Sequence, residues 1–223
     1  DAENNVYVAD FNNIRIQKFD SDGNFLLQWA TEAPRGPASL GIDADGYIYV
    51  DNFFPHKHHL QKFDAAGTLV SEWGATGGEP GQFGAKGASG PEDVAIDQAG
   101  NIYVSDRVNH RVQKFDPDGN LLTIFGGEAS KDGQGLFDQP LGLAVASSGN
   151  LYVLDVGSKL LQLLDADGKF IAQWSTKGGD LDQAIGIVAL DSNDDLYIMA
   201  RGEVMGANGK ATKAIVLKKF QHP

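Results

Sequence analysis

Three of the five histidines fall in one short segment, which reads Pro55-His56-Lys57-His58-His59. In a strand, His56 and His58 would point to one face and His59 to the other. Two imidazoles side by side can begin a zinc, copper or nickel site, but such a site needs further ligands. The sequence names no third ligand, so we expect a solvated polar hairpin and no tightly held transition metal. Near-stoichiometric zinc that is lost in a His58→Ala variant would contradict this expectation.

Turns of the form Asp-x-Asp-Gly raise the question of calcium. An EF-hand loop begins in this way, but it also needs further oxygen ligands and a closing glutamate. After Asp20-Ser21-Asp22-Gly23 come Asn24 and then apolar residues. We therefore interpret these sequences as β-turns, in which the first aspartate accepts backbone N–H groups and the glycine adopts a positive φ. The same interpretation holds for the turns at 64–67, 116–119 and 165–168.

An aspartate that follows a recurring Tyr-Val pair could contribute to a ring of acidic groups. The set is Asp10, Asp51, Asp106 and Asp155. Recurrence in successive units favours a structural role, in which each carboxylate accepts N–H groups of its own hairpin. Asp51 stands one residue earlier in register than the others, and its neighbour Asn52 is expected to take their place.

The elements that must position these residues recur about every 45–50 residues. Each repeat has a strand with a tyrosine, a strand that ends in an apolar residue, usually Phe, a turn with Gly, and a strand that ends in an aromatic residue. The tyrosines are Tyr7, Tyr49, Tyr103, Tyr152 and Tyr197, and the closing aromatics are Trp29, Trp73, Phe125 and Trp174. The segment before each tyrosine strand is almost wholly apolar, as at 94–96, which is typical of burial on both faces. The segment at 111–115 alternates, which predicts a half-buried outer strand.

Four short strands per repeat predict an all-β protein, a β-propeller of four-stranded antiparallel blades. A single sheet of this kind exposes an apolar face, and stacking on the next repeat buries that face. We expect one domain over residues 1–223. Its five partial or full blades are expected at about 1–30 (partial), 37–74, 91–126, 140–175 and 184–221 (partial).

The third repeat carries the most specific pattern. Tyr-Val-x-Asp at 103–106 is followed by Asn-His-Arg-Val-Gln-Lys-Phe-Asp at 109–116 and by a turn with Gly. This pattern resembles the NHL repeat, and the resemblance implies an NHL-type propeller, usually a six-bladed ring. The visible strands are too few for six blades, so we expect a further stretch of chain or a capping partner to close the ring. An open blade face and strand edge would otherwise favour aggregation.

In propellers that this chain resembles, the starts of the innermost strands line the mouth of the central channel. The corresponding residues are Ala38-Ser39, Glu92-Asp93, Leu141-Gly142 and Gly186-Ile187, so one blade alone supplies acids. The resemblance implies that calcium-dependent lactonases and lyases of similar shape gather ligands or bases from several blades here. It also implies a histidine after the inner-strand proline in the NHL-type amidating lyase, where this sequence has Ala38, Glu92 and Leu141. We therefore assign no catalytic residue, metal or cofactor, and a metal-assisted hydrolase or lyase at the mouth is the alternative.

The preferred function is a non-catalytic recognition scaffold that binds a protein, peptide or glycan through loops between strands. Blade sides must stack on their neighbours, whereas loops on a rigid scaffold are free to vary. The second blade has a longer hairpin with Phe53-Phe54-Pro55-His56, and the fifth has a long Gly-rich insertion from Gly202 to Lys213. Aromatic residues and methionine suit contact surfaces, although Phe53 and Phe54 could instead fold back onto their own blade. The candidate ligand-binding residues are Phe53, Phe54, His56, Glu92, Asp93, Arg107, Arg201 and Met205.

Charge and composition limit the partners. The 223 residues include 18 basic and 30 acidic ones, for a formal charge of −12, and no basic stripe suits phosphates. We therefore expect no nucleic-acid partner. No apolar stretch is long enough to span a bilayer, so membrane insertion is not expected. The absence of cysteine excludes disulfides and thiolate sites. It fits the expected extracellular or periplasmic location, and a cytosolic location as well.

Overall fold

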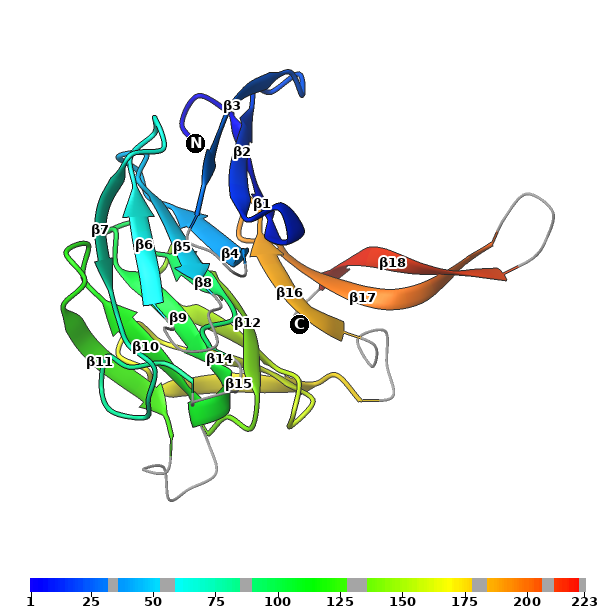
Figure 1. Cartoon of the computed structure of the whole chain (residues 1–223). Coiled ribbons are helices and arrows are strands. Elements are labelled where there is room, and N and C mark those ends of the chain that lie inside the picture. The colour runs from blue at the N-terminus through cyan, green and yellow to red at the C-terminus, as the bar shows by residue number, and fades with distance from the viewer. Residues whose placement is uncertain are drawn as a thin grey trace.

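The chain folds into five antiparallel sheets arranged as the blades of a β-propeller (Figure 1). The computed structural model describes residues 1–31, 36–52, 59–84, 90–127, 136–177, 184–205 and 211–220. Successive blades contain three, four, four, four and three strands. The predicted all-β propeller is therefore confirmed. Within the described residues, no helix is both long and apolar enough to cross a bilayer.

The strands follow one pattern from blade to blade. The first blade has β1 (Val6–Asp10), β2 (Arg15–Phe19) and β3 (Phe25–Ala30). The second has β4 (Pro37–Ile42), β5 (Ile48–Asn52), β6 (His59–Phe63) and β7 (Leu69–Trp73). The third has β8 (Val94–Ile96), β9 (Ile102–Asp106), β10 (Arg111–Phe115) and β11 (Leu121–Gly126). The fourth has β12 (Pro140–Val145), β13 (Leu151–Asp155), β14 (Leu160–Leu164) and β15 (Phe170–Ser175). The fifth has β16 (Ala184–Leu190), β17 (Leu196–Met205) and β18 (Ala211–Phe220).

The inner strands β4, β8, β12 and β16 contact one another in that order and lie toward the centre of the arc (Figure 1). Apolar residues of each blade pack against the next blade and form a separate core at each interface. Between the second and third blades this core includes Tyr49, Leu60, Val94, Val104 and Phe115. The inner strands are thus fixed by packing, which positions whatever side chains stand at their ends.

The closing aromatic of one blade covers the turn glycine of the following blade. A Cβ atom added at Gly67 would lie 2.6 Å from the Trp29 ring, and one at Gly119 would lie 2.8 Å from the Trp73 ring. At Gly168 the distance to the Phe125 ring would be 2.0 Å. These glycines also have a positive φ, at +81°, +86° and +83°. The turns therefore need glycine both for their backbone conformation and for the close approach of the ring.

The prediction of a half-buried outer strand at 111–115 is wrong. Strand β10 lies between β9 and β11, and most of its residues are buried. Its polar side chains bind the linker that joins the second and third blades. Arg111 donates to the carbonyls of Gly78 and Gln82 at 2.9 and 2.8 Å, and Gln113 donates to Gln82 at 2.7 Å. The alternation in the sequence reflects a buried polar contact rather than exposure to water.

The long insertion of the fifth blade is mostly strand rather than loop. Strands β17 and β18 pair without interruption from Leu196 and Phe220 to Met205 and Ala211. The hairpin extends away from the rest of the molecule (Figure 1). The sequence suggested a loop because of its glycines, but residues such as Val204 and Thr212 suit a pleated ladder and continue the pairing.

Candidate functional site

The starts of four inner strands meet at one end of the channel, where they line a cavity of about 520 Å³. The lining residues are Ala38, Ser39, Leu40, Glu92, Asp93, Val94, Arg107, Leu141, Leu143, Gly186, Ile187 and Val188. The residues that the sequence placed at the channel mouth are therefore brought together, with Gly142 beside them. Arg107 joins them from the short 3-10 helix η2 (Arg107–Asn109). We call this cavity the mouth.

Asp93 is the most extensively bonded polar side chain of the mouth. Its Oδ1 accepts the Ser39 hydroxyl at 2.5 Å and the backbone N–H of Val94 at 2.9 Å. Its Oδ2 accepts the backbone N–H of Leu143 at 2.8 Å, so the carboxylate joins three blades. Burial raises the pKa of Asp93 to about 6, against the opposing effect of these hydrogen bonds. The carboxyl group can therefore change its charge near neutral pH.

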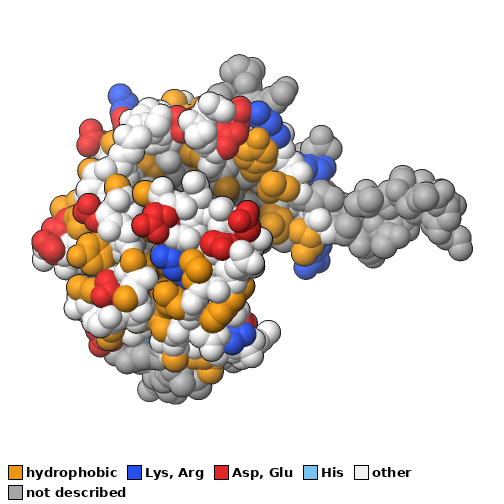
Figure 2. Space-filling model, turned by 90° about the horizontal axis from the view of Figure 1, so that it is seen from above, with side chains coloured by type: hydrophobic (Ala, Val, Ile, Leu, Met, Phe, Trp, Pro, Cys, Tyr) orange, Lys and Arg blue, Asp and Glu red, His pale blue; other side chains and the backbone are white. Residues whose placement is uncertain are grey.

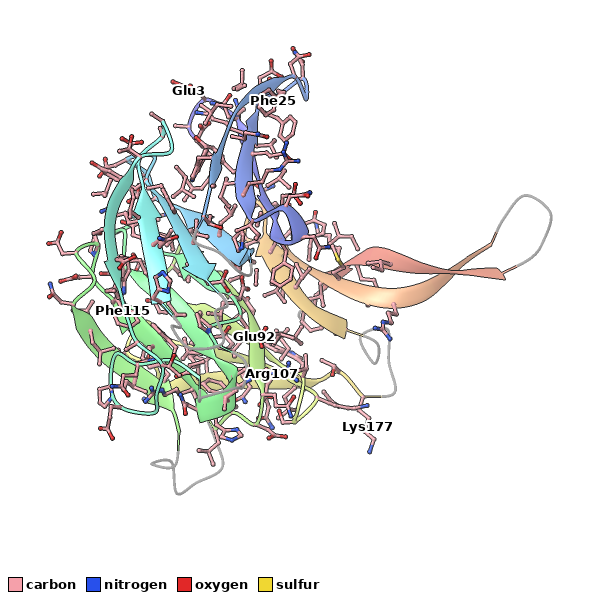
Figure 3. All side chains as sticks on the ribbon, viewed as in Figure 1. Glu3, Phe25, Glu92, Arg107, Phe115 and Lys177 are labelled. Carbon is pink, nitrogen blue, oxygen red and sulfur yellow. The ribbon has the colours of Figure 1, made fainter. Side chains whose placement is uncertain are left out.

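Glu92 and Arg107 lie side by side at the mouth (Figure 3). One guanidinium nitrogen of Arg107 is 3.8 Å from the Glu92 carboxylate. The same side chain donates to Gln139 Oε1 at 3.2 and 2.6 Å, which fixes its orientation. The positive charge of Arg107 is therefore directed at Glu92 and at the linker of the next blade.

Asp51 lies next to this group, although it does not line the cavity. It is fully buried, and its Oδ1 accepts the backbone N–H groups of Ala38 and Ser39 at 2.9 and 2.6 Å. Ser39 thus bonds Asp51 with its N–H and Asp93 with its hydroxyl. Burial raises the pKa of Asp51 well above its usual range, and the nearby charges of Asp93 and Glu92 add to this effect. The sequence identified Asp51 only as one of the repeated aspartates.

The register explains why Asp51 differs from the other repeated aspartates. Asn52 pairs with His59 in the way that Asp106 pairs with Arg111, so Asn52 occupies the common position. Asp51 instead corresponds to Ser105 of the following blade. The offset of one residue was the signal in the sequence that could have placed Asp51 near the mouth.

At the common position the aspartates have the structural role that the sequence predicted. Asp106 is fully buried and accepts hydrogen bonds from Gly84 N–H, Asn109 Nδ2 and Arg111 Nε, each at 2.8 Å. Asp155 accepts the N–H groups of Asp138, Gln139 and Gly157. These two carboxylates hold hairpins and inter-blade linkers in place through hydrogen bonds with described residues.

The Asp-x-Asp-Gly sequences form turns, as predicted. Asp116 accepts the N–H groups of Asp118 and Asn120 at 3.0 and 2.8 Å, together with the Asn120 side-chain amide. These hydrogen bonds lower the pKa of Asp116. Asp20 makes the same set of bonds with Asp22 and Asn24. The described residues include no group of three His, Asp or Glu side chains arranged to hold a metal ion.

The remaining candidate residues lie elsewhere. Phe53, Phe54 and His56 fall outside the described residues. Arg201 is exposed on β17, paired with Ile215, and is not among the residues that line the mouth. Met205 ends β17 opposite Ala211, and its side chain is not described. Of the predicted set, Glu92, Asp93 and Arg107 are the ones that the structure brings together.

Basic side chains are scattered on the face shown in Figure 2 rather than gathered in a stripe. Acidic side chains lie between them, near the centre of the face and at its rim (Figure 2). The formal charge is −12, and the face shown has no basic stripe among its described residues that would follow a phosphate backbone (Figure 2). The prediction against nucleic acid stays a prediction.

The sequence matches known repeat proteins over part of its length. A family model for the NHL repeat matches residues 89–115. The chain is similar to Protein brain tumor of Drosophila melanogaster, with 33% identity over 131 residues, which is 56% of this chain and 12% of that protein. It is also similar to human NHL repeat-containing protein 3, with 28% identity over 131 residues, which is 52% of this chain and 36% of that protein. The matched part is thus a minor share of each relative.

Solved structures match over most of the chain. Virginiamycin B lyase from Staphylococcus aureus superposes with a TM-score of 0.65 and 12% identity, over 95% of this chain and 66% of that one. A protein of unknown function from Bacteroides caccae gives a TM-score of 0.62 and 16% identity, over 89% of this chain and 67% of that one. At these identities the likeness shows a shared propeller fold and no shared activity.

Proposed function

Because the chain belongs to the NHL-repeat family, we propose that it is a non-catalytic recognition module that binds a segment of a protein or peptide at the mouth. The composition of the mouth supports this proposal. One blade supplies Glu92, Asp93 and Arg107, whereas the other three blades supply Ala, Ser, Leu, Gly, Ile and Val. Acid–base or metal-assisted catalysis requires several converging ionisable groups, and a binding site requires apolar walls with a few placed polar groups.

The mouth also has the exposed apolar surface that a partner would cover. Ile187 lines it and is 51% exposed, although large apolar side chains are usually buried. A glycan is the other partner class, and it would need more hydrogen-bonding groups than the walls of the mouth offer.

A peptide selection would test the proposal. Random peptides displayed on phage are selected on the intact protein, and the affinities of the selected peptides are measured by calorimetry. We expect Ile187→Asp to weaken their binding at least tenfold, because a charge would replace an exposed apolar contact. The matched control is Ile171→Asp on the outer strand β15, where the isoleucine is 47% exposed and far from the inner strands in the blade.

Two results would overturn the proposal. One is a selection that yields no peptide with measurable affinity. The other is full affinity of the selected peptides for Ile187→Asp, since binding would then occur away from the mouth. Retained affinity for Ile171→Asp, together with loss for Ile187→Asp, supports it.

One observation favours a hydrolase or lyase as the second candidate. The pKa of Asp93, about 6, would allow this carboxylate to act as a general base in the mouth. Turnover of chromogenic esters or lactones, with and without added calcium, tests this candidate. Catalysis that is lost in Asp93→Asn would support it, and peptide binding without turnover would support the recognition module.

A further inference from the structure

The mouth contains an excess of negative charge. Glu92 and Asp93 line it, and Asp51 is bonded to the same serine as Asp93. Arg107 is the basic residue among those that line the cavity, and it pairs with Glu92 at 3.8 Å. Backbone N–H groups and the Ser39 hydroxyl donate to Asp51 and Asp93, and among the described residues that line the mouth no cation pairs with either of them.

One carboxyl oxygen in this group has no hydrogen-bond donor in the part of the chain that the structure describes. Asp51 is fully buried, and none of the described residues donates to its Oδ2. The hydrogen bonds of Asp51 show where this side chain points, because its Oδ1 accepts the N–H groups of Ala38 and Ser39, which both line the mouth. Ser39 also donates its hydroxyl to Asp93, so Asp51 lies beside the acidic part of the mouth. A buried acceptor without a donor is costly, and a cation nearby would lower that cost.

The walls of the mouth suit an aliphatic chain. Leu141 and Leu143 come from the fourth blade and Ile187 from the fifth, next to the carboxylates of the third. Lysine and arginine side chains lay their methylene groups along apolar surface and extend the charged group to a polar partner. A bare metal ion would use the carboxylates but not these walls.

We propose that the mouth binds a basic side chain, lysine or arginine, of the partner segment. The cationic group lies against Asp93, with the Asp51 carboxyl group behind it, and the methylene groups contact Leu141 and Ile187. This inference rests on the proposed function and names the chemistry that its partner must carry. The volume of about 520 Å³ accommodates one such side chain with part of its backbone.

Matched peptides test the inference. The probe is a blocked heptapeptide with one central lysine between two leucines, and its counterpart has norleucine in place of lysine, which keeps the aliphatic chain and removes the charge. Affinities are measured by calorimetry, and chemical shifts of the labelled protein locate the site. We expect the lysine peptide to bind at least tenfold more tightly and to shift Ser39, Asp93 and Ile187. Calcium chloride alone should cause no comparable shifts.

Substitutions distinguish the effect of the Asp93 charge on peptide binding from an effect on folding. Asp93→Asn should abolish the preference for lysine, while Asp167→Asn, an exposed aspartate of a turn in the fourth blade, should leave it unchanged. If Asp93→Asn does not fold, Glu92→Gln at the edge of the same group is the second variant, and it should reduce the preference severalfold. Equal affinity for lysine and norleucine peptides, or calcium shifts that replace peptide shifts, would overturn the inference. Binding at the mouth by peptides without a basic residue would also overturn this inference. It would still agree with the proposed function as a recognition module.

Discussion

Asn109 and Arg111 of the Asn-His-Arg signature in the third blade bind the linker that precedes this blade. Asn109 donates to the carbonyls of Gly77 and Gly84 at 3.0 and 3.1 Å, and Arg111 donates to Gly78 and Glu79, both at 2.9 Å. Asp106 bonds both donors and so holds them in place. A linker carries carbonyl groups that no sheet satisfies, and here side chains satisfy them. The most specific part of the sequence pattern is thus explained by folding rather than by a ligand.

These contacts predict that two equivalent substitutions differ widely in their effect on the free energy of unfolding. Asp106→Asn leaves the Arg111 guanidinium, 8% exposed, without its charged partner, so we expect the free energy of unfolding to fall by about 3 kcal/mol. Asp10→Asn breaks the equivalent pair with Arg15 in the first blade, where the side chains are 21% and 32% exposed. Its effect should be much smaller, because water screens that pair. Urea denaturation of both variants checks the contrast, which equal losses would refute.

Asp51 shows a limit of predicting the role of a single residue from a repeated motif. The motif placed Asp106 and Asp155 correctly, because their partners are local or lie in the adjoining linker. Asp51 depends on a register shift between Pro37 and Leu40, which leaves the N–H groups of the inner strand free for its carboxylate. The offset of Asp51 by one residue is visible in the sequence, whereas the register shift that frees these N–H groups follows from how the blade packs.

Asp93 predicts a dependence of stability on pH. Its pKa is raised to about 6 in the folded protein, whereas an unfolded aspartate has a value of about 3.9. Between these values the folded protein binds more protons than the unfolded chain, so its free energy of unfolding falls as the pH rises. The contribution is complete below pH about 4 and is lost above about 6, and it amounts to about 3 kcal/mol at most.

Denaturation of wild type and Asp93→Asn over a pH series measures this contribution. The difference in unfolding free energy between the two proteins should change between pH 4 and 6 and stay constant above 7. Asp51, whose pKa is raised as well, gives a slope of the same sign that remains in the variant. A difference that does not vary with pH would show that Asp93 keeps an ordinary pKa.

At the scale of elements, the contact between an aromatic ring and a turn glycine joins each of the first three blades to the blade that follows it. Phe125 is the penultimate residue of β11, the outer strand of the third blade, and covers Gly168 in the fourth. Gly23 has the same place and the same φ of +83° in the first blade, but nothing lies within 4 Å of its added Cβ. The first blade therefore has the turn without the contact.

This pair of glycines gives a matched test of the contact. Gly23→Ala should cost about 1–2 kcal/mol, the strain of a left-handed conformation. Gly168→Ala should cost roughly 2–5 kcal/mol, because the Phe125 ring must also move. Thermal unfolding of the two variants measures the difference. A Gly168→Ala variant no less stable than Gly23→Ala would mean that the ring adapts without loss.

The strands themselves were the part of the fold that the sequence predicted best. Tyrosines, closing aromatics and turn glycines mark element ends through local chemistry, and the strands fall between them as expected. The burial of β10 could not be predicted in this way, because the linker at 77–84 that covers it is irregular and comes from elsewhere in the chain. The sequence predicted a loop where β17 and β18 pair, because its glycines were given more weight than the strand pattern that continues through the segment.

At the scale of the whole molecule, the position of a blade in the stack decides how much its residues contribute to stability. One valine recurs directly after the repeated tyrosine in each of the first four blades, as Val8, Val50, Val104 and Val153. The last three are fully buried against the preceding blade, whereas Val8 is 41% exposed. The six-bladed ring, and the chain or partner expected to close it, stay predictions. A closing chain or partner would cover the exposed face of the first blade.

Because the valine recurs, the same substitution in each blade can measure how much blade stacking contributes to stability. Val50→Ala removes two buried methyl groups, so the free energy of unfolding should fall by roughly 1.5–3 kcal/mol. Val104→Ala and Val153→Ala should show losses of similar size, because these side chains are equally buried. Val8→Ala should stay within about 0.5 kcal/mol of wild type, as an exposed side chain does. Urea denaturation of the four variants gives the comparison. A loss at Val8 as large as that at Val50 would show that the face of the first blade is covered in solution, and a second measurement of Val8→Ala over a range of protein concentrations would then tell whether another copy of the chain covers it.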